Sequence, residues 1–170
     1  MTSPRTSRKV FAVAIALAAL LLTAALPVAA APAPAVRGGG VVDGPLGVTS
    51  QLGFTASTNG GSFLCVMAGR SGGFPFDPWD EIRQMQVQGR VTPGTLEIDG
   101  AWSRFEGVAT IHVVGVGGGG VLKATLVDVR FVSTQGAGGA GVAWHLLEVP
   151  DLGLTFGPAP MASGHISIWE

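Results

Sequence analysis

The sequence is poor in cysteine, in charged side chains and in helical periodicity, and each shortage excludes a class of protein. Cys65 is the only cysteine, so no disulfide can form within the chain. We expect a buried, inert thiol in a strand, because a free cysteine behaves as a small hydrophobe; a reactive thiol or pairing with another chain is the alternative. Charged residues make up 12% of the chain, and no basic run marks a nucleic-acid surface.

Helical periodicity is missing after the first thirty residues, and those thirty residues have the layout of a secretory signal peptide. Arg5, Arg8 and Lys9 form a positive start, and residues 10–26 are almost entirely apolar. Val28-Ala29-Ala30 then supplies the small residues that a signal peptidase needs. We expect this signal-peptide helix, residues 1–30, to be cleaved after Ala30 during export from a bacterium.

Two other interpretations of the leader stay open. The apolar run approaches the roughly 18 residues that span a bilayer, so an uncleaved membrane anchor is one alternative. Pro27 and the small residues after it favour cleavage, because a stop-transfer segment would carry charges there. Residues 7–11 also resemble a twin-arginine export signal with Lys9 in place of the second arginine, which favours the ordinary secretory route. No stable membrane span remains after cleavage.

Removing the leader changes the charge of the chain. The leader contains three of the ten basic residues and none of the eleven acidic ones, which leaves seven basic and eleven acidic residues and a net charge of −4. This mildly acidic surface excludes a footprint for nucleic acid or for an anionic membrane. Residues 31–35 alternate alanine with proline as a short extended tether. Residues 36–170 have the length of a single domain.

Glycine is abundant where helical signals are missing. The chain has 27 glycines, all after the leader and without a Gly-X-Y period, which favours many short strands joined by tight turns. We predict an all-β fold of nine or ten short antiparallel strands, arranged as a single sandwich or a partly closed barrel. The predicted strands are 37–42, 48–57, 62–68, 82–91, 95–99, 103–114, 121–131, 142–149, 152–156 and 163–169.

The strongest strand signal lies in the middle of the chain and predicts a long β-hairpin. Residues 103–114 and 121–131 alternate between apolar and polar side chains on either side of a glycine-rich loop over residues 115–120. In the second segment Asp128 falls on the face that Leu126 had kept apolar, so the alternation changes phase. We predict a β-bulge or a sharp bend within residues 124–128.

Aromatic side chains and two prolines interrupt the strand pattern over residues 69–79. Phe74, Phe76 and Trp79 form either a plug over one end of the core or an exposed ligand-binding patch. We favour the plug, because large side chains in loops more often cover a core. The same three residues are the ligand-binding candidates if the patch is exposed.

Patterns of metal ligands are weak. Asp77, Asp80 and Glu81 form the densest acidic cluster and could hold calcium. Their spacing is not that of an EF-hand loop, so solvated loop charges are the favoured interpretation. The histidines are isolated and no second cysteine completes a zinc set. We expect surface or satisfied buried histidines at His112, His145 and His165, and no cofactor.

Two strings match functional motifs in letters only. Residues 69–73 fit G-x-S-x-G, yet Pro75 and Pro78 follow where a nucleophile elbow needs its helix. Residues 115–120 fit a dinucleotide-binding fingerprint, yet a strand pattern follows instead of a helix that would hold a pyrophosphate. We therefore expect a protein that is not an enzyme.

Short glycine-containing motifs are spread over nearly all of the predicted domain. They are Gly38-Gly39-Gly40, Leu52-Gly53-Phe54-Thr55-Ala56, Gly107-Val108-Ala109-Thr110, Val127-Asp128 and Ser163-Gly164-His165-Ile166-Ser167-Ile168. Together they resemble the post-COAP domain, a small secreted β-domain found mainly in actinobacterial and related bacterial proteins. The chain departs from the family pattern where Val129-Arg130-Phe131-Val132 continues a strand instead of forming a polar turn. The resemblance implies the fold and the exported address, and it supplies no catalytic residue.

The function expected from the sequence is a secreted, non-catalytic β-domain that binds a partner or has a structural role at or outside the bacterial cell envelope. The partner is not readable from the residues. One alternative is a carrier whose barrel holds an apolar ligand, lined by residues such as Phe54, Met85, Phe105 and Trp144. Another is a small hydrolase or isomerase, which needs a histidine and a carboxylate meeting in a cleft.

Overall fold

The structure is a computed structural model that describes residues 33–44, 48–71 and 78–170. The predicted signal peptide and the start of the tether lie outside the described residues, as do Phe74, Phe76 and Asp77. Among the residues that are described, no helix has the length and hydropathy needed to cross a membrane.

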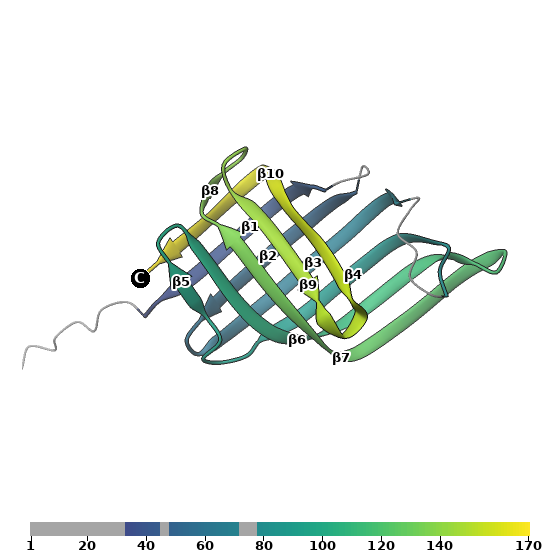
Figure 1. The fold of residues 1–170 in the computed structure, drawn as a ribbon, viewed down its shortest axis with the longest axis horizontal. Coiled ribbons are helices and arrows are strands. Elements are labelled where there is room, and N and C mark those ends of the chain that lie inside the picture. The colour runs from purple at the N-terminus through teal and green to yellow at the C-terminus, as the bar shows by residue number, and fades with distance from the viewer. Residues whose placement is uncertain (1–32, 45–47, 72–77) are drawn as a thin grey trace, which may run out of the picture. The chain divides into compact units, whose positions relative to one another are not determined.

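Ten strands account for most of the described chain, and eight of them close into an antiparallel barrel (Figure 1). The barrel order is β1-β2-β3-β4-β6-β7-β9-β10, and β10 returns to pair with β1. The two extra strands are β5, which pairs with β6, and β8, which pairs with β10. The strands are β1 Ala35–Asp43, β2 Thr49–Ser57, β3 Gly60–Ser71, β4 Glu81–Val91, β5 Glu97–Asp99, β6 Trp102–Gly117, β7 Gly120–Gly136, β8 Gly138–Gly139, β9 Trp144–Val149 and β10 Leu154–Trp169.

The predicted all-β class is confirmed, and of the two predicted architectures the structure has the barrel. Closure depends on the ends of the chain, because β1 pairs with β10 from Ala35 opposite Trp169 to Val42 opposite Met161. This ladder joins the first and the last strand of the sheet, so the sheet closes on itself instead of splitting into the two layers of a sandwich.

Several strands are longer than predicted, most clearly at the C-terminus. The predicted strands 152–156 and 163–169 are parts of one strand, β10. A register shift between Phe156 and Ala159 takes Pro158 out of the ladder with β9, so the proline does not end the strand. The connection between the predicted strands 121–131 and 142–149 also contains strand, because β7 continues to Gly136 and β8 follows it.

The central hairpin is confirmed as the pair β6 and β7, with a much tighter turn than predicted. Gly117 pairs with Gly120, so only Gly118 and Gly119 form the loop. Their φ angles of 57° and 85° belong to the left-handed region that a two-residue turn of type I′ requires at both positions. Glycine adopts this conformation without a steric cost.

The predicted bulge is present in β7. Ala109 of β6 pairs with Val129, whereas Ile111 pairs with Leu126. Thr110 therefore stands alone opposite two residues of β7, which is the definition of a β-bulge. The inward set changes from the even-numbered residues before the bulge to the odd-numbered residues after it, as the change of phase in the sequence predicted.

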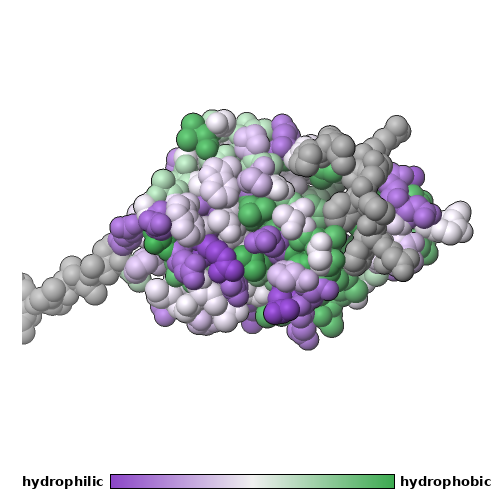
Figure 2. Space-filling model, in the orientation of Figure 1, coloured by the Kyte–Doolittle hydropathy of each residue, from purple (hydrophilic) through white to green (hydrophobic). Residues whose placement is uncertain are grey.

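The barrel interior is filled by side chains from all the long strands. Phe54, Phe63, Phe105 and Phe131 are buried and form a continuous aromatic cluster. The ring centres of Phe63 and Phe131 lie 4.8 Å apart, and those of Phe54 and Phe105 lie 5.6 Å apart. Burying each ring stabilises the fold by roughly 2–3 kcal/mol. On the face that Figure 2 shows, polar and apolar residues are interspersed among the described residues.

Candidate functional site

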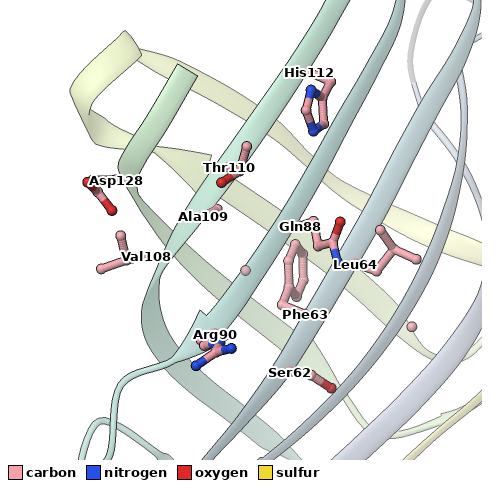
Figure 3. A pocket seen from close by; sticks show the side chains of 12 residues that line it. Ser62, Phe63, Leu64, Gln88, Arg90, Val108, Ala109, Thr110, His112 and Asp128 are labelled. Carbon is pink, nitrogen blue, oxygen red and sulfur yellow. The ribbon is translucent and has the colours of Figure 1, made fainter. Parts of the chain in front are cut away.

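A groove of about 720 Å³ lies on the outer wall of the barrel. Its lining comes from β2, β3, β4, β6 and β7 (Figure 3). The lining residues are Gly53, Ser62, Phe63, Leu64, Gln88, Gly89, Arg90, Val108, Ala109, Thr110, His112 and Asp128. We call this hollow the wall groove.

Strand alternation explains which side chains reach the wall groove. Leu64 of β3 pairs with Gln88 of β4, and Gln88 pairs with Thr110 of β6. These three residues point outward, because their neighbours along each strand, such as Phe63 and Val87, are buried in the core. Adjacent strands lie about 4.8 Å apart, so the row forms a continuous strip across three strands. Gly53 extends the strip onto β2, and no atom lies within 4 Å of the position that a Cβ would take there.

Several polar side chains of the wall groove have no partner within the described part of the protein. Gln88 and Arg90 are exposed on β4, and their side chains make no hydrogen bond or ion pair with another described residue. The side chain of Asp128, on the opposite side of the groove, also has no hydrogen-bond or ion-pair partner among the described residues. Leu64 and Val108 add apolar surface, each with 41% of its area exposed. The groove therefore offers a cation, an anion, an amide and aliphatic carbon to a ligand.

The bulge in β7 determines where the carboxylate of the groove lies. Asp128 is the only described residue other than glycine with a positive φ, at 57°. Aspartate tolerates this left-handed conformation better than most residues. The extra residue turns Asp128 outward, while the next residue, Val129, is buried. The sequence predicted this bulge but could not show that it borders a groove.

A second polar cluster lies inside the barrel and is closed to solvent. Ser103, Ser133, Gln135 and His145 are its members, and all four are buried. The Gln135 Nε2 atom donates to the Ser103 hydroxyl over 2.6 Å, and the Ser133 hydroxyl donates to Gln135 Oε1 over 2.9 Å. The Ser133 oxygen also lies 3.0 Å from His145 Nε2. We call these four residues the core polar network.

The hydrogen bonds of the core polar network assign a structural role to its histidine. Ser133 has a single hydroxyl proton, which Gln135 accepts, so His145 Nε2 must donate its own proton to Ser133. A serine nucleophile needs the reverse direction, with the imidazole accepting the serine proton. Burial lowers the pKa of His145 to about 4, because the charged imidazole would be desolvated beside the rings of Phe54 and Phe63.

The aromatic and acidic candidates from the sequence are only partly described. Trp79 is buried, and its Nε1 atom donates to the carbonyl of Leu122 over 3.3 Å, in agreement with a plug at this position. Asp80 is exposed, and Glu81 lies 3.9 Å from Arg83. Across residues 33–44, 48–71 and 78–170, no three side chains of the types His, Cys, Asp and Glu lie close enough to hold a metal ion.

The histidines and the cysteine have the environments that the sequence predicted. His112 is exposed, with its Nδ1 atom 3.0 Å from the Thr125 hydroxyl oxygen, and His165 is exposed as well. His145 is the satisfied buried histidine. Cys65 is buried in β3, and burial raises the pKa of its thiol to about 12. Such a thiol is protonated at neutral pH and does not react as a thiolate.

Sequence reasoning missed both the wall groove and the core polar network as units. Alternation in β4 and β6 identified Gln88 and Thr110 as outward residues, yet nothing local shows that the wall above them is hollow. Ser103 and Gln135 join through a bond between residues 32 positions apart, which only the sheet order brings together. This chain matches no protein-family model, no curated protein and no solved structure.

Proposed function

We propose that this chain is an exported, non-catalytic binding domain at or outside the bacterial cell envelope, and that its ligand lies in the wall groove. The observation that carries the proposal is the convergence of Gln88, Arg90 and Asp128 on one hollow without partners among the described residues. Side chains that serve only the fold are normally paired or solvated singly, whereas convergent polar groups in a concavity are typical of ligand sites.

Barrel packing favours the wall over the interior as the place of the ligand. Phe54, Met85 and Phe105, which the carrier alternative would need around a chamber, are buried in the packed core. Trp144 is half-buried and packs against Gly136. An apolar cavity between β3, β4 and β10 has a volume of about 20 Å³, which is room for about one water molecule. An apolar ligand of ordinary size would require the core to open.

The polar groups of the groove favour binding over hydrolysis. His112 and Asp128 both line it, but no hydrogen bond joins them, and His112 Nδ1 is next to Thr125. The histidine with a perturbed pKa, His145, contacts a serine in the core instead of a carboxylate in a cleft. A general acid–base pair needs both groups within hydrogen-bond reach of one substrate, which supports a non-catalytic role.

Export rests on the leader, together with the resemblance to the post-COAP domain. A chain with a cleaved signal peptide and a net charge of −4 would reach the cell surface without attraction to anionic lipid. The resemblance adds a secreted bacterial context and no activity.

Binding by isolated groove variants tests the proposal. The exported chain is incubated with the insoluble cell-wall fraction and with the concentrated culture medium of its host, and the bound material is measured by co-sedimentation and mass spectrometry. Gln88→Trp, which fills the centre of the groove from an exposed position, should abolish binding. Gln51→Trp is the matched control, because Gln51 is exposed on β2 outside the groove.

Thermal unfolding of both variants must match that of the original chain for the comparison to count. Equal binding by Gln88→Trp and Gln51→Trp would place the ligand elsewhere and overturn the wall groove as the site. A turnover of any added substrate that disappears on substitution of His112 or Asp128 would overturn the non-catalytic assignment.

A further inference from the structure

Among the described residues, no strand pairs with one side of β7 over the first half of its length. β9 pairs with β7 only from Val132 to Gly136, and the residues of β7 before Val132 pair only with β6. Among the described residues, no backbone hydrogen bond reaches this other side between Val121 and Val129. The hairpin of β6 and β7 extends well beyond the end of the β9–β10 hairpin (Figure 1). Within residues 33–44, 48–71 and 78–170, the barrel therefore has an open strand edge along this part of β7.

Asp151 marks where the β9 ladder ends and the open edge begins. Continuing the register past Val132 would place Pro150 opposite Arg130, and a proline has no N–H to offer. The carboxylate of Asp151 replaces the missing strand, because its Oδ2 atom accepts the Arg130 backbone N–H over 2.8 Å. Its Oδ1 atom accepts the Arg130 side chain over 2.6 and 2.8 Å. Beyond Arg130 no described side chain caps the edge in this way.

The turn of the hairpin determines which backbone groups point out of the open edge. In a two-residue hairpin loop the closing pair, here Gly117 and Gly120, exchanges hydrogen bonds. Because bonded and non-bonded pairs alternate along an antiparallel ladder, the N–H and C=O groups of Val121, Lys123 and Thr125 point away from β6. The same alternation predicts an outward N–H at Arg130 after the bulge, where Asp151 accepts it.

The amino-acid sequence of this edge is nearly the same in the forward and the reverse direction. Residues 121–127 are Val-Leu-Lys-Ala-Thr-Leu-Val, with Ala124 at the centre. Exposure follows the same symmetry, since the odd-numbered residues are exposed and the even-numbered ones are half-buried. Val121 and Val127, at the two ends, have 62% and 66% of their areas exposed. An isologous interface requires a patch that is complementary to itself under a two-fold rotation, and this segment meets that requirement.

We propose that two copies of this chain pair through residues 121–127 of β7, antiparallel about a two-fold axis at Ala124. Val121 then lies opposite Val127 of the second copy, and Leu122 opposite Leu126 of the second copy. Lys123 lies opposite Thr125 of the second copy. The two barrel walls become one continuous sheet, and all outward backbone groups of the segment are paired.

Charge disfavours one neighbouring register. Shifting the pairing so that Lys123 is the centre would place two lysines directly opposite each other, which is destabilising. Lys123 and the bulge are also devices that commonly protect an edge from unspecific pairing. In the proposed register the lysine excludes the wrong alignment, and the bulge limits the paired segment to the residues before Asp128.

A pair of opposite charges at one exposed position tests the interface. Thr125→Glu places a carboxylate opposite Lys123 of the second copy twice per dimer, and Thr125→Lys places a second lysine there. Sedimentation equilibrium should show a Kd lowered roughly tenfold by the first change and raised roughly tenfold by the second, from cross-strand pair energies. Gln51→Glu and Gln51→Lys, on the fully paired strand β2, should leave the Kd unchanged.

A cysteine at the two-fold axis tests the register. The two Ala124 residues would form a non-hydrogen-bonded pair with α-carbons about 4.5 Å apart, which is within disulfide range. Ala124→Cys should give a covalent dimer under mild oxidation, whereas Lys123→Cys should not. A chain that stays monomeric at millimolar concentration, a dimer whose Kd ignores the charge at position 125, or cross-linking through Lys123→Cys alone would each overturn the proposal.

Discussion

At the residue scale, the interior of this barrel contains polar groups only where they satisfy one another. Every buried polar side-chain atom of the described residues has a hydrogen-bond partner or some contact with solvent. The core polar network achieves this with three hydrogen bonds among four side chains. An unpartnered group at the same depth would cost about 1–3 kcal/mol. The network is therefore a condition for placing a histidine beside two phenylalanine rings in the core.

The stability of the barrel should depend on pH through His145. Its pKa is about 4 in the folded chain and about 6.5 when unfolded, so between these values only the unfolded chain binds the proton. The free energy of unfolding should be highest above pH 6.5 and fall by about 3 kcal/mol as the pH drops toward 4. Urea titrations across this range measure the slope, and imidazole NMR shifts identify the group. A folded His145 that titrates near 6.5 would contradict the prediction.

Asp128 should tolerate glycine better than a branched residue, because its φ of 57° is in the left-handed region. We expect Asp128→Gly to be at least as stable as the original chain. Asp128→Val should be less stable than Asp128→Gly by about 1–2 kcal/mol, since a β-branched side chain clashes with the backbone in this conformation. Urea unfolding of the two variants measures the difference. Equal stabilities would show that β7 relaxes out of the left-handed conformation.

At the element scale, the bulge allows one strand to serve two parts of the barrel wall. Before the bulge, Leu122 and Leu126 point inward, and after it Phe131 and Ser133 do. The same bulge carries the carboxylate of the wall groove and ends the symmetric segment of the open edge. A single extra residue thus links the core, the groove and the edge.

Deleting Val127 should remove the bulge and keep the fold. Without it, Asp128 alone stands opposite Thr110, and the pairs on either side keep their partners and their inward faces. Deleting Arg130 is the contrast, because no extra residue absorbs that loss and the alternation breaks; exposing Phe131 forfeits roughly 2–3 kcal/mol. Circular dichroism and urea unfolding should show a cooperative fold for the first deletion and strong destabilisation for the second. Unfolding of the chain that lacks Val127 would contradict this account of the bulge.

At the scale of the whole molecule, closure joins the two ends of the described chain. The last strand, β10, pairs with the first strand, β1. The Cζ atom of Arg37 also lies over the Trp169 ring, 4.8 Å from the ring centre. These contacts join residues from opposite ends of the sequence, so closure has a large entropic cost during folding.

Removing residues 164–170 should therefore open the barrel. The partners of Ala35 to Gly40 disappear, and β1 keeps only its ladder with β2 over these residues. We expect fast amide hydrogen exchange in β1 and a loss of cooperative unfolding, measured by exchange mass spectrometry and calorimetry. The variant Trp169→Ala keeps the ladder and should lose only the contact with Arg37. Native-like exchange in the truncated chain would show that closure is dispensable.

The export that we propose gives a further prediction for the whole molecule. Protein recovered from the medium of an expressing bacterium should begin at Ala31, because Ala30 ends the small-residue cleavage region. Intact-mass spectrometry measures this directly. Replacing Ala30 with a bulky residue such as phenylalanine should retain the leader and hold the chain in the membrane fraction. If the unsubstituted chain itself stays unprocessed in the membrane fraction, the anchor alternative is the correct one.

Local properties of this protein were predictable from the residues alone. Alternation in residues 103–114, the glycines of the central turn and the change of phase near Asp128 depend on neighbouring residues, so they could be predicted without a fold. The all-β class follows from the same local signals. The wall groove could be anticipated only as a set of outward polar residues, because alternation shows which face a side chain takes and not the curvature of that face.

Closure of the barrel, the core polar network and the open edge could not be predicted in this way. Each depends on which strands are neighbours, and strand order is set by contacts between residues far apart in the chain, such as Ser103 with Gln135 or Ala35 with Trp169. The symmetric segment of β7 was visible as letters, yet only the limited length of β9 and the turn at Pro150 leave its edge without a partner strand. Local residue patterns determine where the strands form, whereas contacts between distant residues determine which side chains the barrel encloses and which strand edges it exposes.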